Sequence, residues 1–261
     1  MSFSEREDLI FEEIRKRALD LNEDTYHIAR DGLLFRGEFK YEHDCWTRYP
    51  GEEDLIWDIA SNPMIILTKD TPLESELYDI RIESGRINFK GPDIEPTVRN
   101  AFYDNLHLWT FGILEALNNG NLYLYDDTPS WVELREYYEH APLVRMNCRK
   151  QMGDKTISNS KLSRSLKNYK EQIKGQIQLY DGRVILCCGG SSIIKNFVKE
   201  VYLPDLSPVV SSSNDPWLYY SKQMYKLVIN TYHPSYARAR SPKVFDGLMN
   251  EMKIFVDQKL F

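Results

Sequence analysis

The sequence lacks any apolar run long enough to cross a membrane. A transmembrane helix needs about twenty consecutive apolar residues, and the 261-residue chain has no run that approaches this length. The N-terminal stretch MSFSEREDLIFEE also lacks the basic and then apolar regions of a secretory signal. We therefore expect a cytoplasmic protein with no membrane partner.

Cysteine is scarce, with four residues in the whole chain. Cys45 and Cys148 are isolated, and the adjacent Cys187 and Cys188 do not form a Cys-x-x-Cys pair. This spacing does not fit a zinc site, an iron–sulfur cluster or the disulfide framework of a secreted protein. Cysteines within or beside apolar segments are usually small core residues. We expect reduced structural thiols and no metal or other cofactor.

Basic residues are outnumbered by acidic ones, which gives the chain a net charge of −6. This balance argues against a protein that coats nucleic acid, but the charge is unevenly distributed. Residues 1–60 hold sixteen acidic and eight basic residues, a net of −8, whereas residues 145–174 hold nine basic and two acidic residues, a net of +7. Residues 226–243 add four basic residues and no acidic one. The two basic segments predict local binding of a polyanion such as DNA, although the first could instead be the solvated face of a helix.

Four short, continuous apolar segments alternate with longer segments of helical periodicity. The apolar segments are MIILT (64–68), PLVRMN (142–147), RVILCC (183–188) and KLVINTY (226–232). Runs of this length are typical of strands buried on both faces, and right-handed crossovers through the intervening helices join such strands into a parallel sheet. We therefore predict an α/β protein with a central four-stranded parallel sheet in a three-layer α/β/α arrangement.

The length and the 42% hydrophobic content predict a full-sized core, and we favour a single domain over residues 1–261. Residues 1–60 are predicted as an N-terminal helical extension packed on that domain, with a first helix that opens at the capping box SERE (4–7). The alternating pattern of residues 77–90 predicts a β-hairpin inserted after the first core strand. Residues 207–216, SPVVSSSNDP, are predicted as a loop or as a mobile flap over a site.

Polar or glycine residues follow each of the four predicted strands. Asp70 comes two residues after the first strand, Asn147 ends the second, Gly189 and Gly190 follow the third, and His233 follows the fourth. The carboxyl ends of parallel strands open at one edge of the sheet, where α/β proteins bind ligands. A carboxylate can orient water, an amide can recognise the edge of a pyrimidine, and a histidine can donate to an oxygen that gains negative charge. We expect these groups to converge on one crevice.

The segments ILTKDTP, MNCRKQMGD, RVILCCGGSS and NTYHPSYARAR stand in the same order as the motifs of the uracil-DNA glycosylase superfamily. Over about residues 60 to 255 the chain resembles this superfamily, and it is most similar to the branch whose last motif reads like T-Y-H-P-S-Y. The resemblance implies the three-layer fold. It also implies a DNA repair enzyme that flips a base, above all uracil, and hydrolyses its N-glycosidic bond without a cofactor.

The resemblance further implies roles for individual residues. Asn147 matches the base-recognising asparagine, and His233 matches the histidine that supports departure of the base. Asp70 stands near the position of the residue that holds water or stabilises the cation, and Phe102 is the candidate for stacking on the flipped base. The residues expected to hold phosphates or enter the duplex are Lys150, Ser235, Tyr236, Arg238 and Arg240. The implied partner is DNA, single-stranded or double-stranded, bound by a monomer.

Departures from the family pattern leave other functions open. The first motif lacks its opening glycine, Leu73 stands where a glycine follows the proline, and the iron–sulfur cysteines of the nearest branch are missing. The chain could instead be a non-catalytic member that binds nucleic acid, a nucleotide or a protein partner. A third interpretation is an enzyme that acts on free nucleosides or nucleotides.

Each predicted site residue also has a structural alternative. Asp70 could be a helix cap or turn residue, Asn147 could cap the backbone of the next loop, and His233 could be bonded to the backbone of a rigid turn. Three aromatic residues share one predicted helix, and core packing is the default for any two of them: Phe102, Trp109 and Phe111.

Overall fold

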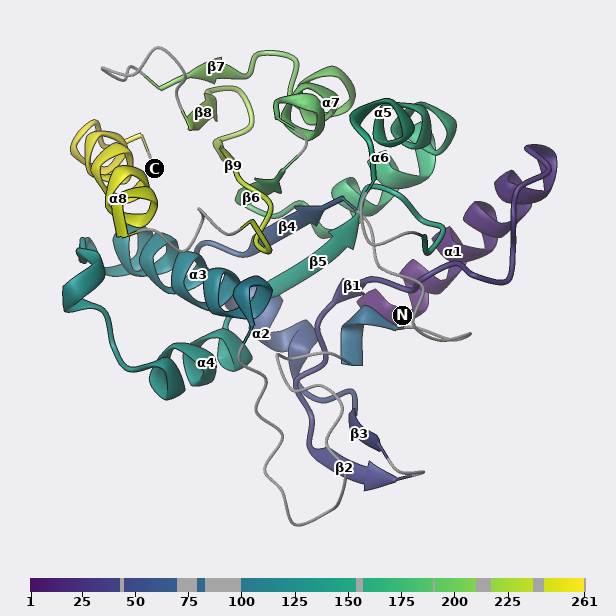
Figure 1. Cartoon of the computed structure of the whole chain (residues 1–261), viewed down its shortest axis with the longest axis horizontal. Helices are drawn as coiled ribbons and strands as arrows, with labels where there is room; N and C mark the ends of the chain where they lie inside the picture. Colours follow the sequence, from purple (N-terminus) through teal and green to yellow (C-terminus); the bar gives the residue numbers. More distant parts are fainter. Residues whose placement is uncertain are drawn as a thin grey trace.

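The structure is a computed structural model that describes residues 1–42, 45–69, 79–82, 100–153, 157–189, 191–209, 217–236 and 242–260. Within these ranges the centre is a seven-stranded sheet with the order β1-β5-β4-β6-β9-β8-β7 (Figure 1). Its strands are β1 (Gly32–Leu33), β4 (Met64–Thr68), β5 (Leu143–Asn147), β6 (Val184–Cys188), β7 (Ser207–Pro208), β8 (Leu218–Ser221) and β9 (Lys226–Thr231). Strands β5, β4, β6 and β9 are the four predicted from apolar runs, and neighbours among them are parallel.

Three antiparallel strands extend this parallel centre, so the predicted four-stranded sheet is too small. β1 pairs with β5 at one edge, while β8 and then β7 follow β9 at the other. β1 and β7 have two residues each, which is too short for an apolar pattern to mark them. Every residue of β4, β5 and β6 is buried. Burial on both faces explains why the central strands are continuous apolar runs.

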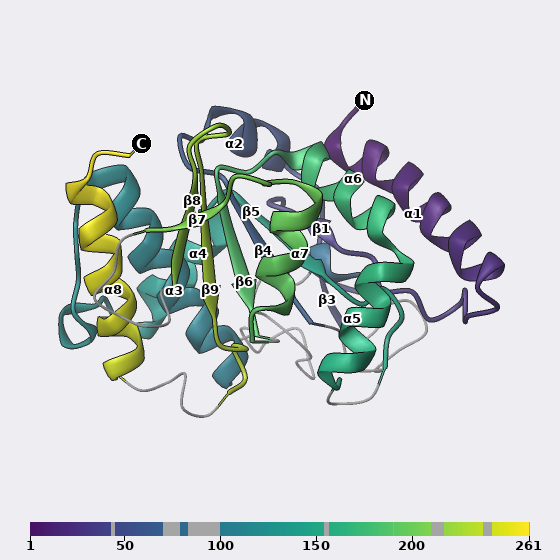
Figure 2. The same cartoon turned by 90° about the horizontal axis from the view of Figure 1, so that it is seen from above.

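Helices cover both faces of the sheet and complete a three-layer α/β/α arrangement (Figure 2). One outer layer contains α1 (Phe3–Asp20), α5 (Asn159–Asn168), α6 (Lys170–Tyr180) and α7 (Ile193–Val201), and the other contains α3 (Ala101–Asn119), α4 (Trp131–His140) and α8 (Pro242–Asp257). Strand side chains alternate between the two interfaces: Ile65 and Leu67 of β4 pack toward α1, whereas Met64 and Ile66 pack toward α3. A shorter helix, α2 (Glu53–Ile59), adds Trp57 to the core on the α1 side.

Residues 1–60 are not only the helical extension that the sequence predicts. α1 packs against α6, β1 is an edge strand of the main sheet, and β2 (Phe39–Glu42) pairs with β3 (Cys45–Arg48) in a separate two-stranded sheet. The segment between the first two helices is polar and contains glycine, and its strands have only two to four residues, so the alternation of FKYE in β2 is too short to mark a strand. The N-terminal part therefore contributes directly to the sheet that carries the strand ends.

The capping box of α1 lies two residues before the predicted one. The Ser2 hydroxyl accepts a hydrogen bond from the Glu5 N–H at 3.1 Å, and the Glu5 carboxylate accepts one from the Ser2 N–H at 2.7 Å. Glu7, predicted as the carboxylate of the box, is instead fully buried on the inner face of the helix. The same four-residue spacing fits both registers, and only packing distinguishes them.

Two predicted loops are described in part. Of the hairpin predicted at residues 77–90, the structure describes residues 79–82, of which Ile80–Ile82 form the 3₁₀ turn η1. Of residues 207–216, it describes 207–209, which include the edge strand β7. The rest of both segments lies outside the described residues. Among the helices in the described part of the chain, none combines the length and the apolar character needed to cross a membrane.

Candidate functional site

The carboxyl ends of the four parallel strands meet at one edge of the sheet. Thr68 at the end of β4 is in register with Asn147 at the end of β5, and Cys188 of β6 is in register with Thr231 of β9. The pairing continues beyond the strands, because the Gly189 N–H donates to the Thr231 carbonyl oxygen at 2.9 Å. The ends of the four parallel strands therefore lie side by side along this edge.

Asn147 is held in one orientation at the end of β5. It is 2% exposed, and Thr68 Oγ1 donates to its Oδ1 at 2.6 Å while its backbone N–H donates to Asp31 Oδ2 at 2.8 Å. Because the carboxamide oxygen is directed at Thr68, the NH₂ group faces the other side. Asn147 lies on the same face of β5 as Arg145, the face that α3 covers. The Asn147 carboxamide is therefore enclosed at the end of β5 and held against Thr68.

A tight turn positions His233 two residues after the end of β9. The Tyr236 N–H donates to the His233 carbonyl oxygen at 2.9 Å and closes the turn. Asn105 Nδ2 of α3 donates to the Pro234 carbonyl oxygen at 2.6 Å, and the Ser235 N–H donates to His233 Nδ1 at 3.2 Å. The imidazole is thus oriented by its own loop, and that loop is tied to α3.

The hydrogen bond to Nδ1 determines the protonation of His233. Because Nδ1 accepts, the neutral ring carries its proton on Nε2. Burial, followed by the positive charge of Lys69, lowers the pKa of His233 from 6.5 to about 4. At neutral pH His233 is therefore an uncharged imidazole with an Nε2–H donor. The backbone-bonded alternative and a site role are compatible, since the backbone uses only one of the two ring nitrogens.

Gly189 allows the loop after β6 to approach His233. Its φ of +85° lies in the left-handed region that favours glycine. A Cβ on Gly189 would lie 2.9 Å from Lys69 Cε and 3.0 Å from His233 Cβ, closer than side chains normally pack. Glycine is required here for the close approach of two loops, while Gly190 lies outside the described residues.

Phe102 lies beside His233, at the start of α3. The two ring centroids are 5.9 Å apart, and the guanidinium carbon of Arg145 lies 5.2 Å from the Phe102 centroid. Trp109 and Phe111 are buried in the core. Phe102 also packs against this core cluster, but it is only partly buried and lies next to the histidine.

Lys150 is not placed to hold a phosphate, which corrects the prediction. Its side chain is fully buried, and Nζ lies 3.0 and 2.8 Å from the two carboxylate oxygens of Asp31. Gln176 Nε2 donates to Asp31 Oδ1 at 2.9 Å and to Glu7 Oε1 at 3.1 Å. Because the ammonium group is paired and enclosed, Lys150 ties the loop after β5 to the N-terminal part of the chain. The exposed basic residues of this segment on α5 are Lys161, Arg164 and Lys167.

The other predicted DNA contacts lie on the loop after β9 or outside the described residues. Ser235 and Tyr236 are exposed on the His233 loop. Asp70, Arg238 and Arg240 lie outside the described residues. The described site therefore does not include Asp70, the carboxylate predicted to hold the water.

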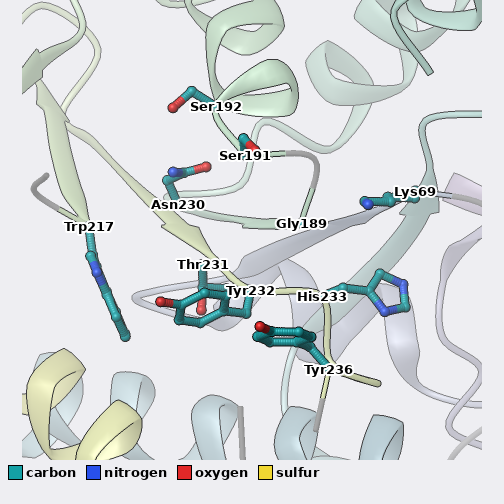
Figure 3. A pocket seen from close by; sticks show the side chains of 10 residues that line it. All are labelled: Lys69, Gly189, Ser191, Ser192, Trp217, Asn230, Thr231, Tyr232, His233 and Tyr236. Carbon is teal, nitrogen blue, oxygen red and sulfur yellow. The ribbon is translucent and has the colours of Figure 1, made fainter. Parts of the chain in front are cut away.

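A cavity of about 360 Å³, which we call the side cavity, lies beside His233 (Figure 3). It is lined by Lys69, Gly189, Ser191, Ser192, Trp217, Asn230, Thr231, Tyr232, His233 and Tyr236. Lys69, Trp217 and Asn230 are not among the site residues predicted from the sequence. The position of Lys69 directly after a core strand is a signal that could have identified it, whereas Trp217 precedes β8, an antiparallel strand with no marked pattern.

The described thiols are structural. Cys148, Cys187 and Cys188 are buried and free, which confirms the prediction for these three residues. Burial raises the pKa of Cys148 to about 12 and also raises the pKa values of the other two thiols, so none is a nucleophile at neutral pH. Within the described ranges, no group of three or more His, Cys, Asp and Glu side chains is arranged to hold a metal ion.

No family model matches the chain, and none of the curated proteins compared with it matches. A functional assignment therefore depends on the site itself. His233, with its Nε2–H donor, and Lys69 line the side cavity, and Phe102 lies beside His233. Asn147 is buried at the end of β5 and is not among the residues that line this cavity.

Proposed function

We propose that this protein is a DNA glycosylase of the uracil-DNA glycosylase type, which flips a base, uracil above all, and hydrolyses its N-glycosidic bond. The observation that carries the proposal is the hydrogen bond from the Ser235 N–H to His233 Nδ1, which leaves Nε2 of this ring as the donor just beyond the carboxyl end of β9. The strand order β5-β4-β6-β9 adds support, because it places the ends of the four motif-bearing strands along one edge.

The reaction requires a bond to form and a bond to break at the same sugar carbon. A water oxygen bonds to C1′ as the bond between C1′ and the base nitrogen breaks, the electron pair leaves with the base, and one water proton passes to a carboxylate or to solvent. The departing pyrimidine gains negative charge on a carbonyl oxygen, which an Nε2–H donor stabilises. His233 supplies this donor in the proposed reaction, and Asp70 keeps its predicted role with the water.

Two further residues recognise the base in this proposal. Asn147 presents its carboxamide to the edge of the pyrimidine, and its hydrogen bond with Thr68 prevents the amide from turning freely. Phe102 offers a ring for stacking next to His233. Because Lys150 is buried, the phosphate contacts are left to the loop after β9 and to the exposed lysines and arginine of α5.

The direct test measures base release from oligonucleotides. Single-stranded and duplex substrates that carry uracil, hypoxanthine or a G·T mismatch are incubated with the protein and then cleaved at alkali-labile sites. We expect release of uracil. His233→Ala should slow this release about a hundredfold or more, as loss of an oxyanion donor does, and Asn147→Ala should slow it roughly tenfold to a hundredfold.

His140→Ala is the matched control. His140 is exposed at the end of α4, and its ring contacts the Glu136 carbonyl oxygen of the same helix, so its replacement should leave release unchanged. If uracil release survives the combined replacement of His233 and Asn147 by Ala, the site is wrong. If no substrate loses a base, the protein is not a glycosylase, and DNA binding without release would then favour the non-catalytic interpretation.

A further inference from the structure

The side cavity has an aromatic wall that the proposed reaction does not use. Tyr232 and Tyr236 are each 43% exposed, so two large aromatic rings lie next to each other at the surface. Their rings stack with centroids 5.5 Å apart, and Trp217 lies edge-on to Tyr232 at 5.8 Å. Exposed rings gathered at a hollow are typical of a surface that binds a flat ligand.

The opposite wall of the side cavity is polar. In Figure 3, Ser191, Ser192 and Asn230 lie across the cavity from the stacked tyrosines. In the described part of the chain, Asn230 Oδ1 is shielded from solvent without a hydrogen-bond partner. Thr231 Oγ1, which lies on the side of the tyrosines in Figure 3, is in the same state. A shielded polar atom without a partner is unfavourable.

We propose that the side cavity binds a second nucleobase, the unpaired neighbour of the nucleotide that is flipped toward His233. This inference rests on the proposed function, because His233 lines the same cavity and joins the two subsites. A nucleobase presents a flat π face to aromatic rings and an edge of donors and acceptors to amides and hydroxyls. The volume of about 360 Å³ is sufficient for one base.

Occupation of the side cavity selects the strandedness of the substrate. In a duplex, a second base could enter only by losing its partner and its stacking neighbours, and this cost adds to that of flipping the first base. In a single strand the neighbouring base is already unpaired. The side cavity therefore specifies single-stranded DNA, or an unpaired region, as the preferred substrate.

The test compares single-stranded oligonucleotides of about ten nucleotides, a length within the usual site sizes. Each carries one uracil. One oligonucleotide keeps all its other bases, and in two others a tetrahydrofuran abasic residue replaces the nucleotide on the 5′ side or on the 3′ side of the uracil. Binding is measured by fluorescence anisotropy. We expect one of the two abasic replacements to weaken binding about tenfold, the loss typical of one stacked base, and the matching duplex to bind more weakly than the intact single strand.

Variants locate this effect in the side cavity. Tyr236→Ala should weaken binding of the intact oligonucleotide and remove its difference from the abasic one, whereas Tyr236→Phe, which keeps the ring, should preserve the difference. Tyr225→Ala is the control, since Tyr225 is 63% exposed and lies just before β9, at the end away from the site. It should bind both oligonucleotides as the unmodified protein does.

The outcomes separate this inference from the proposed activity. Abasic-sensitive binding that Tyr236→Ala removes, without uracil release, supports the side cavity as a base subsite and contradicts the glycosylase. Uracil release with equal binding of intact and abasic oligonucleotides contradicts the subsite alone. If the abasic effect persists in both Tyr236→Ala and Trp217→Ala, the subsite lies elsewhere, and if no oligonucleotide binds, both proposals are wrong.

Discussion

Gly189 and His233 lie so close together that a methyl group on the glycine would be 3.0 Å from His233 Cβ. The loop after β6 thus forms a support for the loop after β9. This contact joins two segments that the sequence separates by more than forty residues, and it places the histidine against the Lys69 side chain as well. The orientation of the proposed leaving-group donor depends on the absence of a side chain at Gly189.

Gly189→Ala should slow base release much more than it affects stability. The new Cβ must push against His233 and Lys69, and a shift of about 1 Å in a catalytic group can cost on the order of a hundredfold in rate. The left-handed φ of +85° should add about 1–2 kcal/mol of destabilisation for a residue with a Cβ. Uracil release and urea unfolding measure the two effects separately.

Gly120→Ala provides the matched control for that substitution. Gly120 ends α3 with a φ of +70°, and a Cβ there meets nothing within 4 Å. It should therefore show a similar loss of stability with unchanged base release. Equal release by Gly189→Ala and the unmodified protein would show that the loop contact does not control the site.

The protonation of His233 should make the folded protein less stable at mildly acidic pH. Its folded pKa of about 4 lies below the ordinary value of 6.5, so between these values the unfolded chain binds more protons at this position. Stability from this residue is fully present above pH 6.5 and declines as the pH falls toward 4. His233→Gln, which has no such titration, should lose less stability than the unmodified protein in urea unfolding between pH 7 and pH 4.5. Parallel losses in both proteins would contradict the depressed pKa.

The elements predicted correctly from the sequence are the strands that are buried on both faces of the sheet. Strand β4, for example, is buried on both faces, so its sequence MIILT is apolar throughout and cannot be mistaken for a surface segment. Strand β1 has two residues at the sheet edge, and nothing in so short a stretch marks it. The direction of parallel strands then placed Asn147 and the His233 loop at one edge without knowledge of any contact.

The role of Lys150 could not be predicted, because its environment comes from a distant part of the chain. Its partner Asp31 is 119 positions away, and nothing local distinguishes Lys150 from the exposed lysines of α5. The Tyr232, Tyr236 and Trp217 cluster presents the same difficulty, since Trp217 reaches the side cavity only through the antiparallel pairing of β8 with β9. Contacts between distant segments, rather than local patterns, determine both.

Lys150→Met should destabilise the protein strongly without changing the salt dependence of DNA binding. The substitution leaves the buried Asp31 carboxylate without its ion-pair partner, a change that typically costs about 3–5 kcal/mol. Lys170→Met removes an exposed pair with Glu200 and should change stability far less, because water screens exposed ion pairs. Urea unfolding measures both, and anisotropy titrations at several salt concentrations measure the slope. A lower slope for Lys150→Met would restore its predicted role at a phosphate.

Glu7 is a buried acid next to this ion pair. It is fully buried on α1, its Oε1 accepts a hydrogen bond from Gln176 at 3.1 Å, and Arg81 Nη1 lies 3.7 Å from its Oε2. Burial, followed by the negative charge of Asp31, raises the pKa of Glu7 from 4.5 to about 8. At neutral pH the folded protein therefore holds a proton at this position that the unfolded chain releases.

The proton on Glu7 should make stability decline as the pH rises from about 4.5 to 8. Across this window the folded state binds one more proton than the unfolded state, so this residue alone contributes a loss of up to about 1.4 kcal/mol per pH unit. Glu7→Gln keeps the hydrogen-bonding shape of the protonated acid and should abolish this component in urea unfolding measured from pH 5.5 to 8. Glu12→Gln, on the exposed side of the same helix, should retain it. Equal pH slopes for Glu7→Gln and Glu12→Gln would mean that Glu7 is charged in the folded protein, with Arg81 and Gln176 compensating its burial.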